Sequence, residues 1–173
     1  MSRLRQLNDL VTGIDSEAKG IALVKSVLPN MTEVIDSSAF GEAGVRNCSI
    51  AAQFIITYFT RGKVDYSKLV NSATQLNETA KAVDFDLKGY LKKDPQALLC
   101  EFGGHNIAIL REGNLYGLYQ AWDGKYHVFP RLNEDGESHN IFGAGDDTVA
   151  LIDSEVNYAQ RKTQTAAKVT VVP

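Results

Sequence analysis

The residue best placed to act as a nucleophile is Cys48, which stands between the glycine-containing segment 41–44 and an apolar run. That run, Ile50–Phe59, predicts a buried helix with the thiol at its start. Unpaired backbone N–H groups and the positive end of the helix dipole favour a thiolate there, so the sulfur is expected to be nucleophilic. Asn47 is a preferred N-cap residue, and Gly62 predicts the C-terminal end of the helix.

A thiol nucleophile needs a base within hydrogen-bond reach, and that base needs a third group to orient it. His105 is the candidate base, because it opens an expected strand directly after Gly103-Gly104, where side-chain crowding is low. A two-residue turn at 112–113 would place Gln120 opposite His105, and a four-residue loop would place it diagonally across on the same face. Only a three-residue loop would separate them. The Gln120 amide oxygen can accept a proton from one ring nitrogen and leave the other for the thiol proton.

The other candidate residues have simpler interpretations. Cys100 lies in an expected apolar strand and is typical of a core residue, and we expect both cysteines to be free thiols. Asp123 is an alternative orienting group, but Asp123-Gly124 is a strong turn signal that accounts for it. His127 is expected within a strand and His139 in a loop. Neither has the spacing of a zinc site with a cysteine, so no metal is predicted.

The size and composition fit one globular domain over residues 1–173. Hydrophobic residues make up 44% of the chain and charged residues 23%, and no apolar run is long enough to span a membrane. The formal net charge of −3, without a cluster of Lys and Arg, argues against nucleic-acid binding. The N-terminus lacks the pattern of a signal peptide.

The elements that must position these residues form two groups, which together predict an α+β fold. The first, about 1–93, is expected to be helical, with one short strand at 31–35 and helices near 4–14, 16–28, 48–59, 66–77 and 84–92. Leucines at three- and four-residue spacing indicate the first of these helices, and Asp15-Ser16 is expected to cap the second. The second, about 96–173, is expected to be an antiparallel sheet that begins as a meander. Its apolar runs are 97–102, 105–111, 115–122, 125–129, 149–152 and 169–172.

Several short segments resemble the papain-like fold toxin domains of bacterial polymorphic toxins and, more distantly, the glutamine deamidase effectors that share that fold. They are Arg46–Ala52, Gly62–Val64 and Gly104–Ile109, together with Gly113. In that family an Asn-Cys pair opens the central helix, a Gly-His pair begins a strand, and the third member lies one hairpin further on. The resemblance covers roughly residues 41–122, about half of the chain.

This resemblance implies a papain-like fold with Cys48 as nucleophile, His105 as base and Gln120 as the orienting residue. The family usually has Asp at the third position, whereas this chain has Gln, as do some deamidase effectors. A neutral amide stabilises an imidazolium less than a carboxylate does, so a weaker ion pair between Cys48 and His105 is expected.

The function implied is amide hydrolysis by a cysteine hydrolase that needs no cofactor. The oxyanion is expected at the start of the helix, in a neighbourhood formed by Asn47, Gly103 and Gly104. Deamidation of a protein glutamine is the first expectation, with proteolysis and transglutaminase-like acyl transfer as alternatives on the same three residues. From another class of protein, the alternative is a non-catalytic binding module in which Cys48 is merely buried.

Membership of such a family would also imply a biological setting. These domains are cargo of larger secreted toxins in bacterial competition, so the resemblance implies delivery into the cytoplasm of a target cell. It further implies a target protein as substrate and a cognate immunity protein that covers the cleft.

Overall fold

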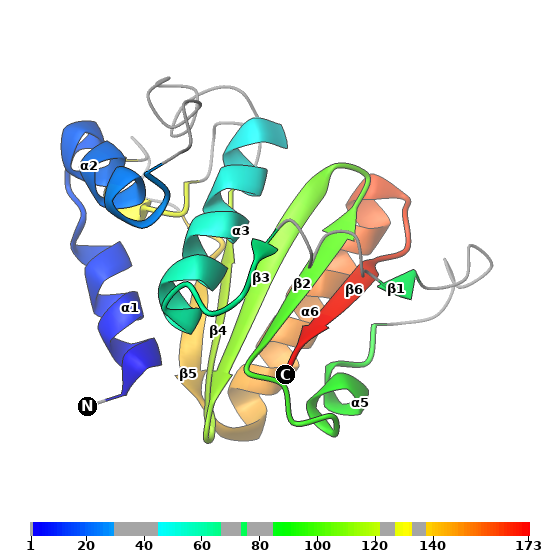
Figure 1. The fold of residues 1–173 in the computed structure, drawn as a ribbon. Helices are drawn as coiled ribbons and strands as arrows, with labels where there is room; N and C mark the ends of the chain where they lie inside the picture. Colours follow the sequence, from blue (N-terminus) through cyan, green and yellow to red (C-terminus); the bar gives the residue numbers. More distant parts are fainter. Residues whose placement is uncertain (1, 30–44, 67–73, 76–84, 122–126, 133–137) are drawn as a thin grey trace.

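The computed structural model describes residues 2–29, 45–66, 74–75, 85–121, 127–132 and 138–173. These residues form an α+β fold in which helices cover both faces of one antiparallel sheet (Figure 1). The elements are α1 (Arg3–Gly13), α2 (Glu17–Val27), α3 (Val45–Thr60), β1 (Thr74–Gln75), α5 (Leu87–Leu91), β2 (Ala97–Phe102), β3 (His105–Glu112), β4 (Leu115–Gln120), the 3-10 helix η4 (Pro130–Leu132), β5 (Ile141–Ala144), α6 (Gly145–Thr163) and β6 (Lys168–Val172).

The strands lie in the order β1-β6-β2-β3-β4-β5, and every neighbouring pair is antiparallel. The expected meander is present in β2, β3 and β4, which pair in sequence order. The C-terminal strand β6 departs from it, because it returns to pair with β2 on the side away from β3. This places β2 and β3 inside the sheet.

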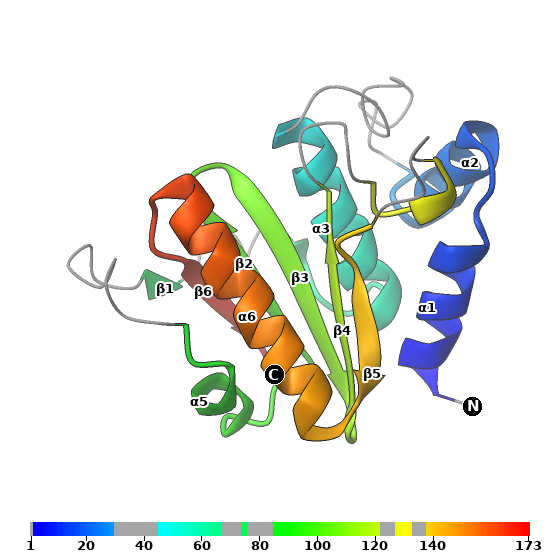
Figure 2. The ribbon, with the colours of Figure 1, turned by 180° about the vertical axis from the view of Figure 1, so that it is seen from behind.

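Each face of the sheet has its own hydrophobic core. Helices α1, α2 and α3 cover one face, and α6 covers the other (Figure 2). Successive strand side chains point to opposite faces, so Ala108 and Leu110 pack with Phe54 of α3, whereas Ile107 and Ile109 pack against the α6 side. Two covered faces explain why β2 and β3 read as continuous apolar runs.

The helix ends confirm two predictions from the sequence. The Ser16 hydroxyl caps α2 by accepting a hydrogen bond from the Lys19 backbone N–H at 3.3 Å. Gly62 ends α3 with a φ of 72°, and its N–H donates to the Thr57 carbonyl at 3.0 Å. A positive φ is tolerated by glycine without strain, so the chain can reverse there.

The long C-terminal helix α6 corrects the sequence prediction. The run 149–152, expected as part of the sheet region, lies inside α6 because the apolar pattern continues beyond it at helical spacing. Its buried apolar residues are Val149, Ile152, Val156 and Ala159. The region after residue 96 is therefore a sheet with a helix packed on it.

Three other expected elements need correction, and a fourth lies outside the described residues. Within the expected helix 66–77, Thr74–Gln75 is instead a strand, where pairing with β6 overrides the local helical pattern. The helix expected at 84–92 is present only as the five residues of α5. Residues 127–129, expected in a strand, form none and lead into η4. The expected strand 31–35 and the segment 41–44 lie outside the described residues.

None of the described helices combines the length and apolar character that crossing a membrane requires.

Candidate functional site

The register of the β3–β4 hairpin brings His105 and Gln120 to the same face of the sheet. Glu112 pairs with Leu115, and Ile107 pairs with Gln120, so His105 lies diagonally across from Gln120. The turn is Gly113-Asn114, one residue later than the two-residue turn that the sequence suggested. The resulting register is the one expected from the alternative four-residue loop.

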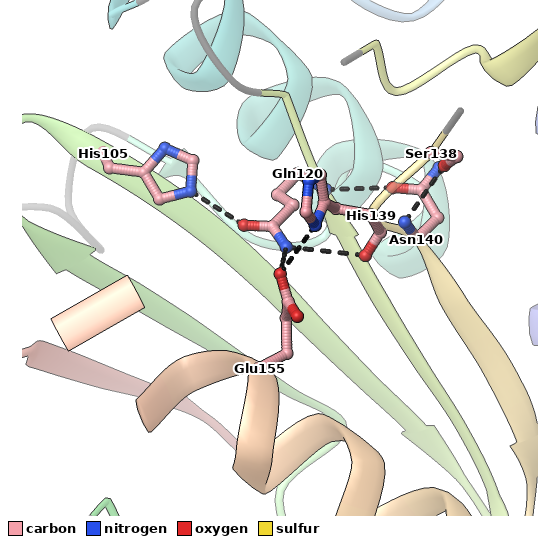
Figure 3. Close-up of polar contacts among 6 residues, drawn as sticks. All are labelled: His105, Gln120, Ser138, His139, Asn140 and Glu155. Carbon is pink, nitrogen blue, oxygen red and sulfur yellow. Dashed lines mark hydrogen bonds and ion pairs between the residues drawn. The ribbon is translucent and has the colours of Figure 1, made fainter. Parts of the chain in front are cut away.

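The side chains of His105 and Gln120 meet directly. The His105 Nε2 lies 2.8 Å from the Gln120 Oε1, and the two residues are only 6% and 0% exposed. Figure 3 shows the ring pointing toward the amide, with its second nitrogen on the side away from Gln120. The Phe102 ring packs on the imidazole at a centroid distance of 5.6 Å. His105 and Gln120 are thus held together in a buried position.

Cys48 lies in the first turns of α3, against the backbone on either side of His105. Its Sγ is 3.3 Å from the Gly104 carbonyl oxygen and accepts a hydrogen bond from the Asn106 Nδ2 at 3.7 Å. Gly104 and Asn106 flank His105 in β3, so the sulfur lies at the segment that carries the expected base, on the face covered by α3, whereas the His105 side chain shares the α6 face with Ile107 and Gln120. The Cys48 residue is 1% exposed.

The two other predicted neighbours of the oxyanion are placed differently. Asn47 is not the N-cap residue expected from the sequence, because α3 already begins at Val45 and includes Asn47 in its first turn. Gly103 has a φ of 59°, and a side chain there would meet Thr165, at 3.2 Å from its hydroxyl oxygen. Gly103 therefore permits the β2–β3 turn, whereas Gly104 is the glycine that contacts the sulfur.

Burial raises the pKa of the Cys48 thiol above its ordinary value. Hydrogen bonding from the Asn106 backbone and side chain, and from the backbone N–H groups of Cys48 and Ser49, lowers the pKa but does not cancel that effect. The thiol is therefore protonated at neutral pH, and it needs a base to become a nucleophile. Burial raises the pKa of Cys100 to about 12, and no other cause contributes.

The structure adds a carboxylate and a second histidine to the predicted group. Gln120 Nε2 donates to Glu155 Oε1 at 2.8 Å, and His139 Nδ1 lies 2.9 Å from the same oxygen (Figure 3). Glu155 comes from α6, which the sequence did not reveal as a helix. His139 comes from the loop before β5, as expected, although the sequence predicts no functional role for it. Only long-range pairing joins these residues to Gln120, so no local sequence signal could have found them.

The end of β4 is held by a further polar contact. The backbone N–H of Gln120 donates to Asn140 Oδ1 at 3.1 Å, and Asn140 Nδ2 donates to the Val128 carbonyl at 2.8 Å. The Asn140 backbone N–H donates in turn to the Ser138 hydroxyl at 3.0 Å (Figure 3). These bonds fix the strand end that carries the Gln120 side chain.

Among the residues that the structure describes, no group of three or more His, Cys, Asp or Glu side chains could hold a metal ion. Both cysteines are free thiols, as predicted. Asp123, the alternative orienting residue, lies outside the described residues, and the described Gln120 occupies the position beside His105. Comparisons of this chain with protein families, curated proteins and solved structures found no match.

The different environments of the two thiols predict different reactivity toward iodoacetamide. Cys100 is fully buried with a strongly raised pKa, whereas the sulfur of Cys48 has hydrogen-bond donors that partly stabilise a thiolate. We expect native alkylation of Cys48 to be slow, limited by local opening, and to accelerate with rising pH, while Cys100 reacts only on unfolding. Peptide mapping by mass spectrometry measures both rates. Equal rates at the two cysteines would contradict the expectation.

Proposed function

We propose that this protein is a cysteine-dependent amide hydrolase of papain-like architecture, with Cys48 as nucleophile, His105 as general base and Gln120 as the orienting residue. One observation carries the proposal. The His105 Nε2 is engaged by Gln120 at 2.8 Å, while the Cys48 sulfur rests against the two residues that flank His105. With Nε2 held in that contact, Nδ1 is the ring nitrogen left for the thiol proton. For this transfer Nδ1 must reach the sulfur around the start of β3, because the His105 ring shares the α6 face with Gln120 while Cys48 lies on the α3 face.

The reaction begins when His105 Nδ1 accepts the Cys48 proton and the sulfur attacks the carbonyl carbon of an amide. The C–N bond then breaks as the imidazolium gives its proton to the departing nitrogen, which leaves a thioester on Cys48. Water attacks the thioester, transfers a proton to His105, and releases the carboxylic acid and the free thiol. Every proton that moves passes through one imidazole.

The oxyanion of the tetrahedral intermediate requires donors near the sulfur. The backbone N–H of Cys48 and the side-chain amide of Asn106 both lie close enough to hydrogen-bond the sulfur. They are the groups we assign to this role, and Asn106, which sequence reasoning did not single out, takes the place expected for Asn47 and Gly103.

The raised pKa of Cys48 favours a neutral thiol in the resting protein. A papain-like enzyme with a carboxylate beside its histidine favours the ion pair instead. The neutral amide of Gln120 is consistent with proton transfer that accompanies attack, as in hydrolases with a hydroxyl nucleophile.

Glutamine side chains of a target protein are the substrate we propose, on the resemblance of the Cys48 and His105 segments to toxin domains and deamidase effectors. That resemblance also leads us to propose delivery within a larger toxin and neutralisation by an immunity protein. Intact-mass analysis of candidate target proteins after exposure to this domain tests the reaction. A gain of about one dalton marks deamidation by the loss of NH and gain of O. A pair of fragments marks proteolysis, and an adduct with an added amine marks acyl transfer.

A second candidate function, a non-catalytic binding module, is favoured by one observation. Cys48 is 1% exposed and its thiol pKa is raised, as in a structural core cysteine. This alternative predicts that no amide is hydrolysed and that Cys48 is alkylated as slowly as Cys100.

The orienting role of Gln120 predicts a loss of turnover without a loss of substrate binding. Gln120→Ala is expected to lower kcat about 100-fold and leave KM nearly unchanged, because the residue holds the ring and does not touch the substrate. Gln120→Glu is expected to impair activity as well, since the new carboxylate would face Glu155 at about the distance now spanned by a hydrogen bond. Steady-state kinetics measures both.

Asp123→Ala is the control for this prediction, because Asp123 is the alternative orienting residue. We expect it to retain wild-type kinetics. An inactive Asp123→Ala variant beside a fully active Gln120→Ala variant would reverse the assignment.

A further inference from the structure

Glu155 is a charged residue in direct contact with Gln120, and no role has yet been assigned to it. We propose that Glu155 is a positioning residue that, through the Gln120 amide, fixes the tautomer of His105 and stabilises its protonated form. This inference rests on the proposed function and deepens it. The observation that supports it is a shared contact: Glu155 Oε1 lies 2.8 Å from Gln120 Nε2 and 2.9 Å from His139 Nδ1 (Figure 3).

The first step concerns the orientation of the Gln120 amide. An ionised carboxylate only accepts hydrogen bonds, so the group of Gln120 that faces Glu155 must be the NH₂. The amide oxygen then faces His105, in agreement with the 2.8 Å contact. An amide facing two neutral groups can flip at little cost, whereas here a flip would bring its oxygen against a carboxylate. Glu155 therefore selects one of the two orientations.

The second step concerns the proton on His105. Because the Gln120 oxygen can only accept, the His105 Nε2 must carry the hydrogen that joins them. In the neutral ring, Nδ1 then has the lone pair that takes the thiol proton. By fixing the orientation of the Gln120 amide, Glu155 therefore fixes the proton of neutral His105 on Nε2. The lone pair is then on Nδ1, the nitrogen proposed as the base.

The third step concerns charge. Burial alone would raise the pKa of Glu155, but hydrogen bonds from His139 and Gln120, and attraction to His139 and His105, hold it below its ordinary value. Glu155 is therefore ionised at neutral pH, and the imidazolium formed on His105 during the reaction gains from its negative charge. Glu155 thus supplies the negative charge that the neutral Gln120 lacks, and it is separated from His105 by the Gln120 amide.

The titratable groups that the described residues bring to Glu155 come from two elements. His139, in the loop before β5, lies 2.9 Å from its carboxylate, and His105 of β3 acts on it through the intervening amide. The β4 strand contributes the neutral Gln120. Because Glu155 and His139 are only 20% and 24% exposed at the side chain, solvent screens their interaction less than that of a surface pair.

The test uses two substitutions that separate charge from hydrogen bonding. Glu155→Gln keeps an acceptor and removes the charge, whereas Glu155→Met removes both at similar length. In nitrogen-15 NMR of histidine-labelled protein, the wild-type His105 is expected to carry its proton on Nε2 when neutral. Glu155→Gln should lower the His105 pKa by about one unit with the tautomer retained. Glu155→Met should also mix the two tautomers.

Kinetics supplies the second readout. We expect kcat to fall about 10-fold in Glu155→Gln and about 100-fold in Glu155→Met, with KM changed less than about 2-fold. Asp147→Asn is the matched control, since it removes one negative charge from an exposed position on the same helix. It should alter neither the His105 pKa nor kcat.

An unchanged His105 pKa and tautomer in folded Glu155→Gln would overturn the inference, as would equal effects of Asp147→Asn. Should Glu155→Met not fold, Glu155→Gln alone decides the question, because its shape is conserved. The NMR readout needs no substrate. A wild-type protein that hydrolyses no amide would therefore refute the proposed function, while the effect of Glu155 on His105 would still be measured.

Discussion

A Cys48→Ala protein is expected to fold and to lose hydrolysis, with turnover reduced roughly 10⁴-fold or more. The substitution removes one buried sulfur near a helix start, which costs about 1–2 kcal/mol of folding free energy, whereas the reaction loses the atom that forms the thioester. Intact-mass analysis of the target protein measures turnover, and thermal unfolding measures stability.

Cys100→Ala is the matched control for this prediction. Cys100 is also fully buried, but it lies in β2 and faces the core beneath α6. We expect it to lose a similar amount of stability and to keep its turnover. A folded Cys48→Ala protein with wild-type turnover would exclude the proposed nucleophile, whatever the behaviour of Cys100.

The second large effect is expected for His105→Ala, with turnover reduced roughly 10³-fold. In the wild-type protein the rate should rise with pH as His105 loses its proton, because only the neutral ring accepts the thiol proton. Without this base the rate depends on spontaneous ionisation of Cys48. Since burial raises the Cys48 pKa, the residual rate of His105→Ala should keep increasing above the ordinary thiol pKa of about 8.5.

The pH–rate profile distinguishes this outcome from a general loss of structure, and His127→Ala provides the control. His127 is similarly buried, at 8% exposure compared with 6% for His105. The control should retain the wild-type profile. If His105→Ala kept the acidic limb of the profile, that limb would belong to another group and His105 would not be the base.

The first two helices could be predicted in detail because their signals are local. Leucines at three- and four-residue spacing gave α1, and Ser16 capped α2 where expected. The apolar run after Cys48 similarly predicted α3 and its end at Gly62. Periodicity, capping and glycine turns act within one or two helical turns, so a sequence read in short windows contains them.

The register at the site was predicted only as a set of alternatives. Sequence placed Gln120 on the face of His105 for two of three loop lengths, and the structure has the diagonal arrangement. The loop position was wrong by one residue, because both 112–113 and 113–114 contain Gly113. Moving the turn by one residue shifts the strand pairing by two positions, and side chains two positions apart lie on the same face. Gln120 therefore stays on the face of His105.

Sequence by itself determined the residues capable of chemistry and the local elements that carry them: a thiol early in a buried helix, an imidazole at a strand start and an amide one hairpin later. Only the tertiary structure decided which distant groups join them. Asn106 meets the sulfur because α3 packs at the start of β3, and Glu155 meets Gln120 because α6 crosses the opposite face at the end of β4. These contacts depend on packing across both faces of a sheet, between residues up to 58 positions apart in the chain, and no local periodicity encodes them.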